Sequence, residues 1–251
     1  MMADFVNTID LLGDEPVTRA IVDRSITEFN DDVLTTVGNL GFHACTALTS
    51  VDLPNATSIG ADAFTSCAKF VSANLPNAIS VGDRAFQQCS VLANVDLSSA
   101  TAIGGYAFYY CNALASLNSP NVTSIGHSAF VQCKSLTSMS FPKLTSLGDS
   151  AFKDCHGLSI IDLGNANSIG QNTFSTCIEL TKIIIRNQTM CSLKNVGAFG
   201  SLTPFGGYGG LTGTVYVPQA LIEQYQQATN WSTLYAAGTC NFVAIEGSEY
   251  E

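Results

Sequence analysis

A single period of 22 residues runs through most of this 251-residue chain. In each period a glycine is followed four residues later by a phenylalanine and three residues after that by a cysteine. The pattern occurs in seven consecutive copies, which begin at Gly38, Gly60, Gly82, Gly104, Gly126, Gly148 and Gly170. These copies contain no insertion or deletion, which would push buried columns of side chains out of register. The period therefore predicts a solenoid in which each repeat is one coil.

The first half of each coil has the pattern of a short strand. Leu48, Val51 and Leu53 form the pattern L-x-x-V-x-L, and its last part alternates apolar and polar residues as a half-buried strand does. Pro54 ends the strand, because proline cannot donate to a sheet ladder. Equivalent apolar positions recur in the later coils. We expect these strands to stack in parallel as one long sheet on one face of the solenoid.

The second half of each coil is expected to cover the opposite face. Ala63, Phe64 and Cys67 are three and four residues apart, which predicts a short α-helical or 3₁₀ segment that buries all three. Gly60 recurs in every coil, either because its φ is positive or because two backbones approach closely there. The predicted fold class is an α/β solenoid with a parallel sheet opposite short helical segments.

The segment from Leu48 to Cys67, LTSVDLPNATSIGADAFTSC, resembles the BspA-type leucine-rich repeat. The hallmark of that family is I-G-x-x-A-F-x-x-C followed by L-x-x-(apolar)-x-L-P. The resemblance covers about Ser25 to Arg186 and continues in degenerate form beyond it. It implies a non-enzymatic protein that binds host proteins or other cells, and similar repeats are common in tail-region proteins of phages and prophages.

Composition limits the classes of partner. Charged residues make up 12% of the chain, and its net charge is −10. An acidic surface disfavours nucleic acid and anionic membrane as partners.

The N-terminus has no basic region before an apolar run, and no apolar run is long enough to span a membrane. We therefore expect no membrane insertion. A place at the cell surface, outside the cell or on a virion would need another export route, and a cytoplasmic location stays open.

Seven of the nine cysteines occupy one column of the repeat. Neighbours in that column are expected about 4.8 Å apart, but parallel side chains rarely reach the dihedral angle of a disulfide. We therefore interpret the column as buried free thiols that fill space in the core. Cys191 and Cys240 lie outside it, and their pairing with each other stays open.

The two ends of the chain depart from the period and are predicted to be caps. Residues 1–36 form the N-terminal cap, with a helix over 14–24 and a first strand over Ser25–Asn30. Regular repeats occupy 37–187. Residues 188–251 hold a degenerate repeat with an insertion over 187–195, a strand ending at Pro218, an amphipathic helix that begins there, and an aromatic segment that closes the sheet.

The chain shows no convincing catalytic constellation, and we expect no cofactor and no metal. The three histidines fall at three different positions of the repeat. Asp52, Asp96 and Asp162 share one outward strand position, but a shallow row of carboxylates lacks the walls of a hydrolase cleft. We interpret this row as a hydrated surface that is also a candidate for binding. A column of asparagines at the following turn is expected to bond neighbouring coils.

Three tyrosines break the repeat near its middle. Tyr106, Tyr109 and Tyr110 stand where other coils carry small or polar residues, with Gln88 and Gln132 in the neighbouring coils. Their spacing predicts one outward aromatic patch. Tyrosine offers a large contact area with a polar tip, which suits recognition of proteins and sugars.

These observations favour a non-enzymatic module for recognition or adhesion, which binds a protein or carbohydrate ligand on a host or cell surface. The first alternative is a structural or tail-associated protein of a phage or prophage particle. A hydrolase that uses Asp52 and Asp96 is a distant third. The sequence leaves the oligomeric state open.

Overall fold

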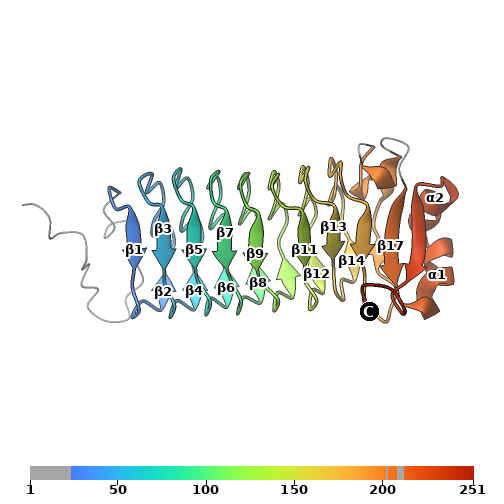
Figure 1. Cartoon of the computed structure of the whole chain (residues 1–251), viewed down its shortest axis with the longest axis horizontal. Helices are drawn as coiled ribbons and strands as arrows, with labels where there is room; N and C mark the ends of the chain where they lie inside the picture. The colour runs from blue at the N-terminus through green and yellow to red at the C-terminus, as the bar shows by residue number, and fades with distance from the viewer. Residues whose placement is uncertain (1–23, 202, 208–211) are drawn as a thin grey trace, which may run out of the picture.

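The computed structural model describes residues 24–201, 203–207 and 212–251. Its coils stack along one axis, and the strands succeed one another along the solenoid in chain order (Figure 1). The helix predicted over 14–24 lies outside the described residues except for Arg24. The 22-residue solenoid with parallel strands is confirmed.

The sheet expected on one face consists of three-residue strands. β1 (Glu28–Asn30), β3 (Ser50–Asp52), β5 (Ser72–Asn74), β7 (Asn94–Asp96) and β9 (Ser116–Asn118) pair in parallel, and β1 falls within the predicted first strand. A separate sheet follows with β11 (Ser138–Ser140), β13 (Ile160–Asp162), β15 (Lys182–Ile184), β17 (Gly213–Val217) and β18 (Cys240–Ala244). Partners are 22 residues apart in the regular coils, as in the pair Val51 and Ala73. The long sheet is therefore interrupted between β9 and β11.

A second column of two-residue strands follows the proline turn, and the sequence did not predict it. Its members are β2 (Thr36–Val37), β4 (Ser58–Ile59), β6 (Ser80–Val81), β8 (Ala102–Ile103), β10 (Ser124–Ile125) and β12 (Ser146–Leu147), followed by the pair β14 (Ser168–Ile169) and β16 (Ser192–Leu193). The apolar second residue of each strand is buried in the core, and Ile59 is 1% exposed. Each coil thus has two parallel pairings with its neighbours.

The expected helical segments opposite the long sheet are turns. Asp62 and Ser66 have φ angles of 56° and 61°, and a right-handed helix cannot continue through such residues. The turns bond to the next coil instead, and Phe64 N–H donates to the carbonyl of Ala85 at 2.7 Å. We call this side of the solenoid the turn face. Helix in the described chain is confined to η1 (Val196–Ala198), η2 (Pro204–Gly206), η4 (Gln219–Leu221), α1 (Ile222–Gln227) and α2 (Trp231–Ala236).

The repeated phenylalanines form a continuous stack through the core. The rings of Phe42 and Phe64 lie 5.0 Å apart and nearly parallel, and the same contact recurs down the axis to Phe174 and Phe199. The repeated glycines let the coils approach. A Cβ on Gly60 would lie 2.5 Å from the backbone nitrogen of Asn39. Close backbone approach, not a positive φ, therefore explains this glycine column.

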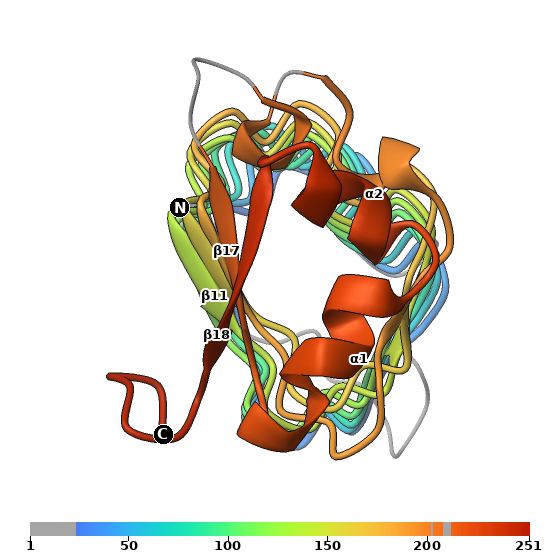
Figure 2. The ribbon, with the colours of Figure 1, turned by 90° about the vertical axis from the view of Figure 1, so that its right-hand side faces the viewer.

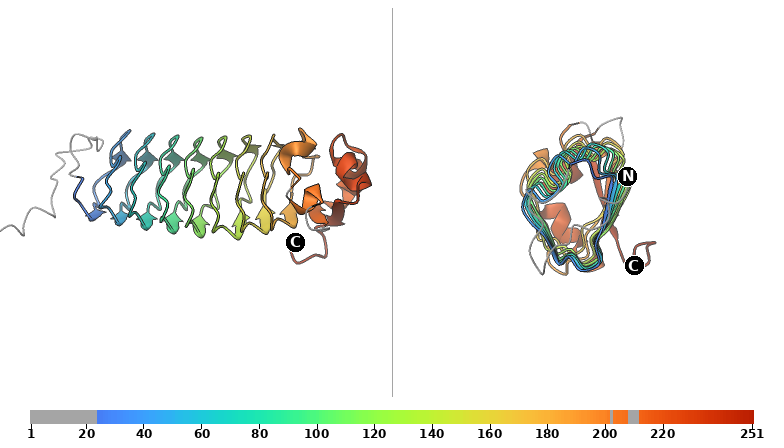
Figure 3. Two further views of the ribbon diagram at one scale, coloured as in Figure 1. Left: turned by 90° about the horizontal axis from the view of Figure 1, so that it is seen from above. Right: turned by 90° about the vertical axis from the view of Figure 1, so that its left-hand side faces the viewer.

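The C-terminal segment closes one end of the core. α1 and α2 cover the last coil beside β17 and β18 (Figure 2), and β18 pairs with β17 as the edge strand. The Trp231 indole donates to the carbonyl of Cys191 at 2.9 Å, and the Tyr225 hydroxyl accepts from the Cys191 amide at 2.8 Å. Seen from above, the coils lie side by side along the axis up to this cap, and seen from the N-terminal end they superpose in front of it (Figure 3). Cys191 and Cys240 are buried and not bonded to each other.

Candidate binding surface

The three predicted tyrosines form one contiguous cluster on the turn face. The ring of Tyr109 lies 5.4 Å from that of Tyr106 and 4.6 Å from that of Tyr110. Tyr110 is 40% exposed, while Tyr106 and Tyr109 are half-buried. Partial burial raises the pKa of Tyr109 above its ordinary value, with a further contribution from the neighbouring Tyr110. The Tyr109 side chain is therefore neutral at physiological pH.

The backbone of the turn face positions these rings. Tyr106 and Tyr110 have φ angles of 56° and 63°, at the two positions that are left-handed in every regular coil. A bulky residue in this region is uncommon and costs about 1–2 kcal/mol. The coil nevertheless holds them there, because the Tyr110 amide donates to Val131 O at 2.9 Å and the Tyr106 amide to His127 O at 2.9 Å. The rings thus sit on a backbone that the neighbouring coil fixes.

His127 belongs to the same cluster, which the sequence did not reveal. Its ring meets Tyr106 edge-on with centroids 4.7 Å apart. It also lies against Gly105, where a Cβ would come within 2.7 Å of the imidazole. One sequence feature could have indicated this contact. Gly105 is a second glycine beside the repeated Gly104, and it lies one coil before His127 in the same column. We call Tyr106, Tyr109, Tyr110 and His127 the aromatic cluster.

Polar ladders flank the aromatic cluster on both sides. Ser66 donates to the Gln88 amide oxygen at 3.1 Å, and Gln132 donates to Asp154 at 3.2 Å. These residues occupy the same column as Tyr110. The tyrosine therefore interrupts a row of side-chain hydrogen bonds and leaves an aromatic surface between two polar ones.

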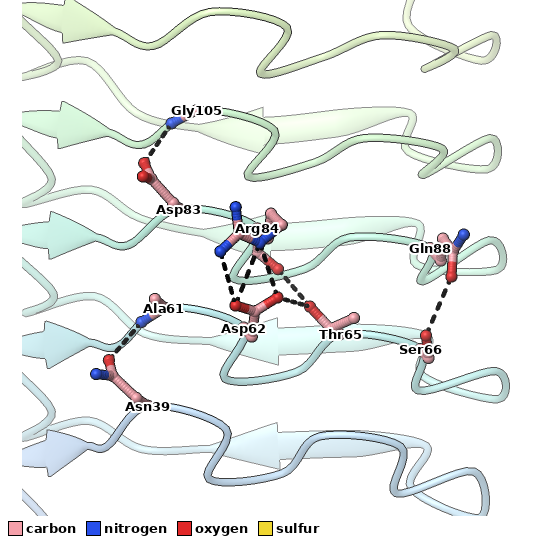
Figure 4. A network of polar contacts seen from close by, with 9 residues as sticks. All are labelled: Asn39, Ala61, Asp62, Thr65, Ser66, Asp83, Arg84, Gln88 and Gly105. Carbon is pink, nitrogen blue, oxygen red and sulfur yellow. Dashed lines mark hydrogen bonds and ion pairs between the residues drawn. The ribbon is translucent and has the colours of Figure 1, made fainter.

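A denser polar network precedes the cluster by one to two coils (Figure 4). Arg84 forms an ion pair with Asp62 at 3.1 Å, and Thr65 donates to the carbonyl of Arg84 at 2.6 Å. The Asp62 carboxylate raises the pKa of Arg84, chiefly through their hydrogen bond. Asp83 accepts from the Gly105 amide at 2.7 Å. These contacts link successive coils and fix the turn face beside the tyrosines.

The aspartate row divides into two environments. Asp52 and Asp96 lie along one shallow, open depression of about 340 Å³ over β1 to β7. Each carboxylate accepts from an asparagine of the next coil, Asn74 at 2.7 Å and Asn118 at 3.0 Å. These amides bind the carboxylates as a polar ladder. The arrangement fits the predicted hydrated row.

Asp162 does not belong to that exposed row, so its expected outward position is wrong. It is 8% exposed, and Arg186 pairs with it at 2.9 Å. Arg186 also donates to the carbonyl of Tyr250 at 2.9 Å. The C-terminal segment therefore covers this end of the sheet, which the 22-residue period could not reveal.

The asparagine column bonds neighbouring coils as predicted. Asn77 donates to the carbonyl of Pro54 at 2.8 Å, and Asn121 donates to that of Ser98 at 2.8 Å. These bonds span 23 residues and satisfy turn carbonyls. The column is structural.

The cysteine column is buried and not disulfide-bonded. Burial raises the pKa of Cys155 well above its ordinary value, which opposes a role as nucleophile. In the part of the chain that the structure describes, no group of three or more histidine, cysteine, aspartate or glutamate side chains is placed to hold a metal ion. Within the same part, no helix is long and apolar enough to span a bilayer.

Comparison with known proteins agrees with this architecture. The family described as the BspA type leucine-rich repeat region matches residues 24–121 and 101–201 with six copies. No curated protein sequence matches the chain.

Among solved structures, the leucine-rich repeat protein TpLRR of T. pallidum is 21% identical over 69% of this chain and 71% of its own, with a TM-score of 0.50. The pneumococcal vaccine antigen PcpA is 15% identical over 87% of this chain and 56% of its own, with a TM-score of 0.55. A leucine-rich cell surface protein of Faecalibacterium prausnitzii is 21% identical over 69% of this chain and 66% of its own, with a TM-score of 0.44. At these identities, the likeness to TpLRR and PcpA establishes the fold alone. The family match extends over most of the described repeats, and the chain belongs to the BspA-type leucine-rich repeat family.

Proposed function

We propose that this protein is a non-enzymatic recognition solenoid whose aromatic cluster binds a protein or glycan at a cell or particle surface. The observation that carries the proposal is the contiguous cluster of the Tyr106, Tyr109 and Tyr110 rings, of which Tyr110 is exposed and the other two are half-buried. The buried phenylalanine and cysteine columns beneath it follow the repeat. The cluster is where the chain departs from what its fold requires.

The chemistry of the cluster suits such a ligand. Tyrosine rings supply apolar contact area at a low cost in side-chain entropy, and their hydroxyls donate and accept hydrogen bonds. The rings are held in place before a ligand binds, because the left-handed backbone at Tyr106 and Tyr110 is hydrogen-bonded to the next coil. Such preorganisation reduces the entropy lost on binding. The net charge of −10 favours a neutral or basic ligand surface over a polyanion.

The test replaces the three tyrosines by residues that equivalent positions of other coils carry. The variant Tyr106→Ser, Tyr109→Thr, Tyr110→Ser adopts the residues of Ser128, Thr65 and Ser66 and is expected to keep the fold. Fluorescently labelled protein is then applied to fixed epithelial cells and to a printed glycan array. We expect the variant to lose at least about tenfold in binding, since several buried aromatic contacts at 1–2 kcal/mol each are removed.

A matched control changes the same three columns three coils later, away from the cluster, with Asn172→Ser, Ser175→Ala and Thr176→Ser. This control has the same number of substitutions on the same face and is expected to bind as the native protein does. Equal binding by the tyrosine variant and the native protein would refute the proposed role of the cluster.

Two alternatives remain as predictions. A structural or tail-associated role in a phage particle requires the intact chain in purified particles, which mass spectrometry of gradient-purified particles tests. A hydrolase role requires an activity that disappears in Asp52→Asn and Asp96→Asn. The amide ladders that bind both carboxylates oppose this third role.

A further inference from the structure

The strands β9 and β11 belong to neighbouring coils, yet they form no ladder in the described chain. The preceding coils show which bonds are missing. Leu75 N–H donates to Asp96 O at 3.1 Å, and Leu97 N–H donates to Asn118 O at 2.9 Å. The equivalent bond would join Ser119 to Ser140. Figure 1 shows β9 and β11 further apart than the strands before them, and we call this interruption the seam.

One core column changes its residues at the seam. Its members are Leu53, Leu75, Leu97, Ser119, Phe141, Leu163 and Ile185. A small serine thus adjoins a large phenylalanine where other coils stack aliphatic residues. Ser119 is 3% exposed, and its hydroxyl has no hydrogen-bond partner among the described residues. A buried hydroxyl without a partner is costly, so this site has an unsatisfied polar group.

The rest of the two coils stays connected. β10 pairs with β12 in the second column, and Phe108 N–H donates to Ala129 O at 2.7 Å on the turn face. The coils therefore separate on the sheet face alone. Because β10 and β12 remain paired, β9 and β11 can separate while the two coils stay joined.

The seam holds an open groove of about 380 Å³. Its lining residues are all uncharged: Ala115, Ser116, Leu117, Asn118, Ser119, Pro120, Ser138, Met139, Ser140 and Pro142. The two walls are strand edges whose N–H and C=O groups recur at the strand period, and parallel strands bond through such groups. The lining has no charge to recognise an anion or a cation. It has the donors and acceptors that recognise a peptide main chain.

We infer that the seam between β9 and β11 binds an extended, uncharged peptide segment that carries an aliphatic side chain. The main chain of the peptide bonds to the unpaired edges, as in strand addition to a sheet. Its aliphatic side chain points inward beside Ser119 and takes the place of the missing leucine. This site lies on the sheet face, so the inference does not rest on the role of the aromatic cluster.

The experiment follows backbone amides of the full chain by ¹⁵N–¹H NMR during titration with acetyl-Ser-Val-Asn-Leu-Thr-amide. We expect saturable shifts at Leu117, Ser119, Ser138 and Ser140. Acetyl-Ser-Pro-Asn-Pro-Thr-amide lacks two N–H donors and is expected to bind at least tenfold more weakly. Maltotriose serves as a neutral ligand of another class and is expected to leave these amides unshifted.

Two variants test the structural cause. Ser119→Leu with Phe141→Leu restores the ordinary column, and we expect it to close the seam, slow hydrogen exchange at Ser119 and Ser140, and weaken peptide binding at least tenfold. Ser119→Ala keeps the small side chain and is expected to bind like the native protein. Absence of peptide shifts, equal binding by the double leucine variant, or shifts with maltotriose alone would each overturn the inference. The tyrosine variant described above should bind the peptide normally, which separates failure here from failure of the proposed function.

Discussion

The thiol of Cys111 donates a hydrogen bond of 3.1 Å to the carbonyl of Phe86 in the preceding coil. The same bond recurs from Cys67 to Phe42 and from Cys177 to Phe152, each at 3.0 Å. The cysteine column is therefore both a filler of the core and a row of donors to turn carbonyls. Alanine would fill part of the space but leave those carbonyls without this partner.

These thiols are expected to make stability depend on alkaline pH. Burial raises the pKa of Cys89, Cys111, Cys133 and Cys155 well above the ordinary value, and raises that of Cys191 and Cys240 to about 12. The unfolded chain loses these protons first as pH rises past about 8.5. Stability is thus fully present below that pH and declines above it, by about 1.4 kcal/mol per thiol at one pH unit higher.

Urea unfolding at pH 7.0, 8.5 and 9.5 measures this decline. Cys111→Ala should reduce the loss between pH 8.5 and 9.5 by the contribution of one thiol. Ellman's reagent should react slowly with the native protein at pH 8 and rapidly after unfolding. Rapid reaction of the folded chain would contradict the buried column.

Replacing Gly104 by alanine is expected to destabilise the fold by at least about 2 kcal/mol through overpacking. A Cβ there would lie 2.6 Å from the backbone of Asp83 and of Gly82, and backbone cannot move aside as a side chain can. Gly247 provides the contrast, since it has a φ of 78° and open space around it. Asparagine tolerates that φ, so Gly247→Asn should cost little while Gly104→Asn unfolds the chain. Thermal unfolding by circular dichroism compares the variants, and similar losses at both sites would contradict close approach as the cause.

Ser150→Asn is expected to stabilise the protein by about 0.5 kcal/mol, because asparagine tolerates the left-handed region better than serine. Ser150 has a φ of 58° and carries no large apolar side chain, so the substitution relieves backbone strain without removing buried apolar surface. Asn172 occupies the same column with a φ of 55° and is exposed. Asn172→Ser is the reverse control and should destabilise by a similar amount in urea unfolding. A gain in both variants would show that φ is not the cause.

Arg186→Ala should lower the free energy of unfolding by about 1–3 kcal/mol, since it leaves a buried carboxylate without its cation. Asp162 is buried against the C-terminal segment, and Arg186 joins it to Tyr250. Arg84→Ala is the matched control because the side chains of Arg84 and Asp62 are 46% and 22% exposed, against 35% and 11% for Arg186 and Asp162. We expect no measurable change in its melting temperature. Equal effects of the two substitutions in calorimetry would contradict the difference in burial.

The sequence by itself determined the architecture. A 22-residue period with no insertions allows only stacked coils, and its columns identified Phe64 and Cys67 as core and the asparagines as bonds between coils. It also identified the tyrosines as a departure from the scaffold, because a repeat makes every irregular residue visible. These inferences succeeded because neighbouring repeats share nearly the same environment.

Tertiary structure decided what depends on contacts between non-equivalent residues. The left-handed φ of Asp62 replaced the expected helix by turns, since coil-to-coil hydrogen bonds hold a backbone that local spacing could not reveal. Asp162 became buried because a tail outside the period folds over it. His127 packs against Tyr106 beside Gly105, and the long sheet is interrupted between β9 and β11, where Ser119 adjoins Phe141 in one core column. A period specifies the average coil, whereas packing between particular side chains specifies where one coil differs from the next.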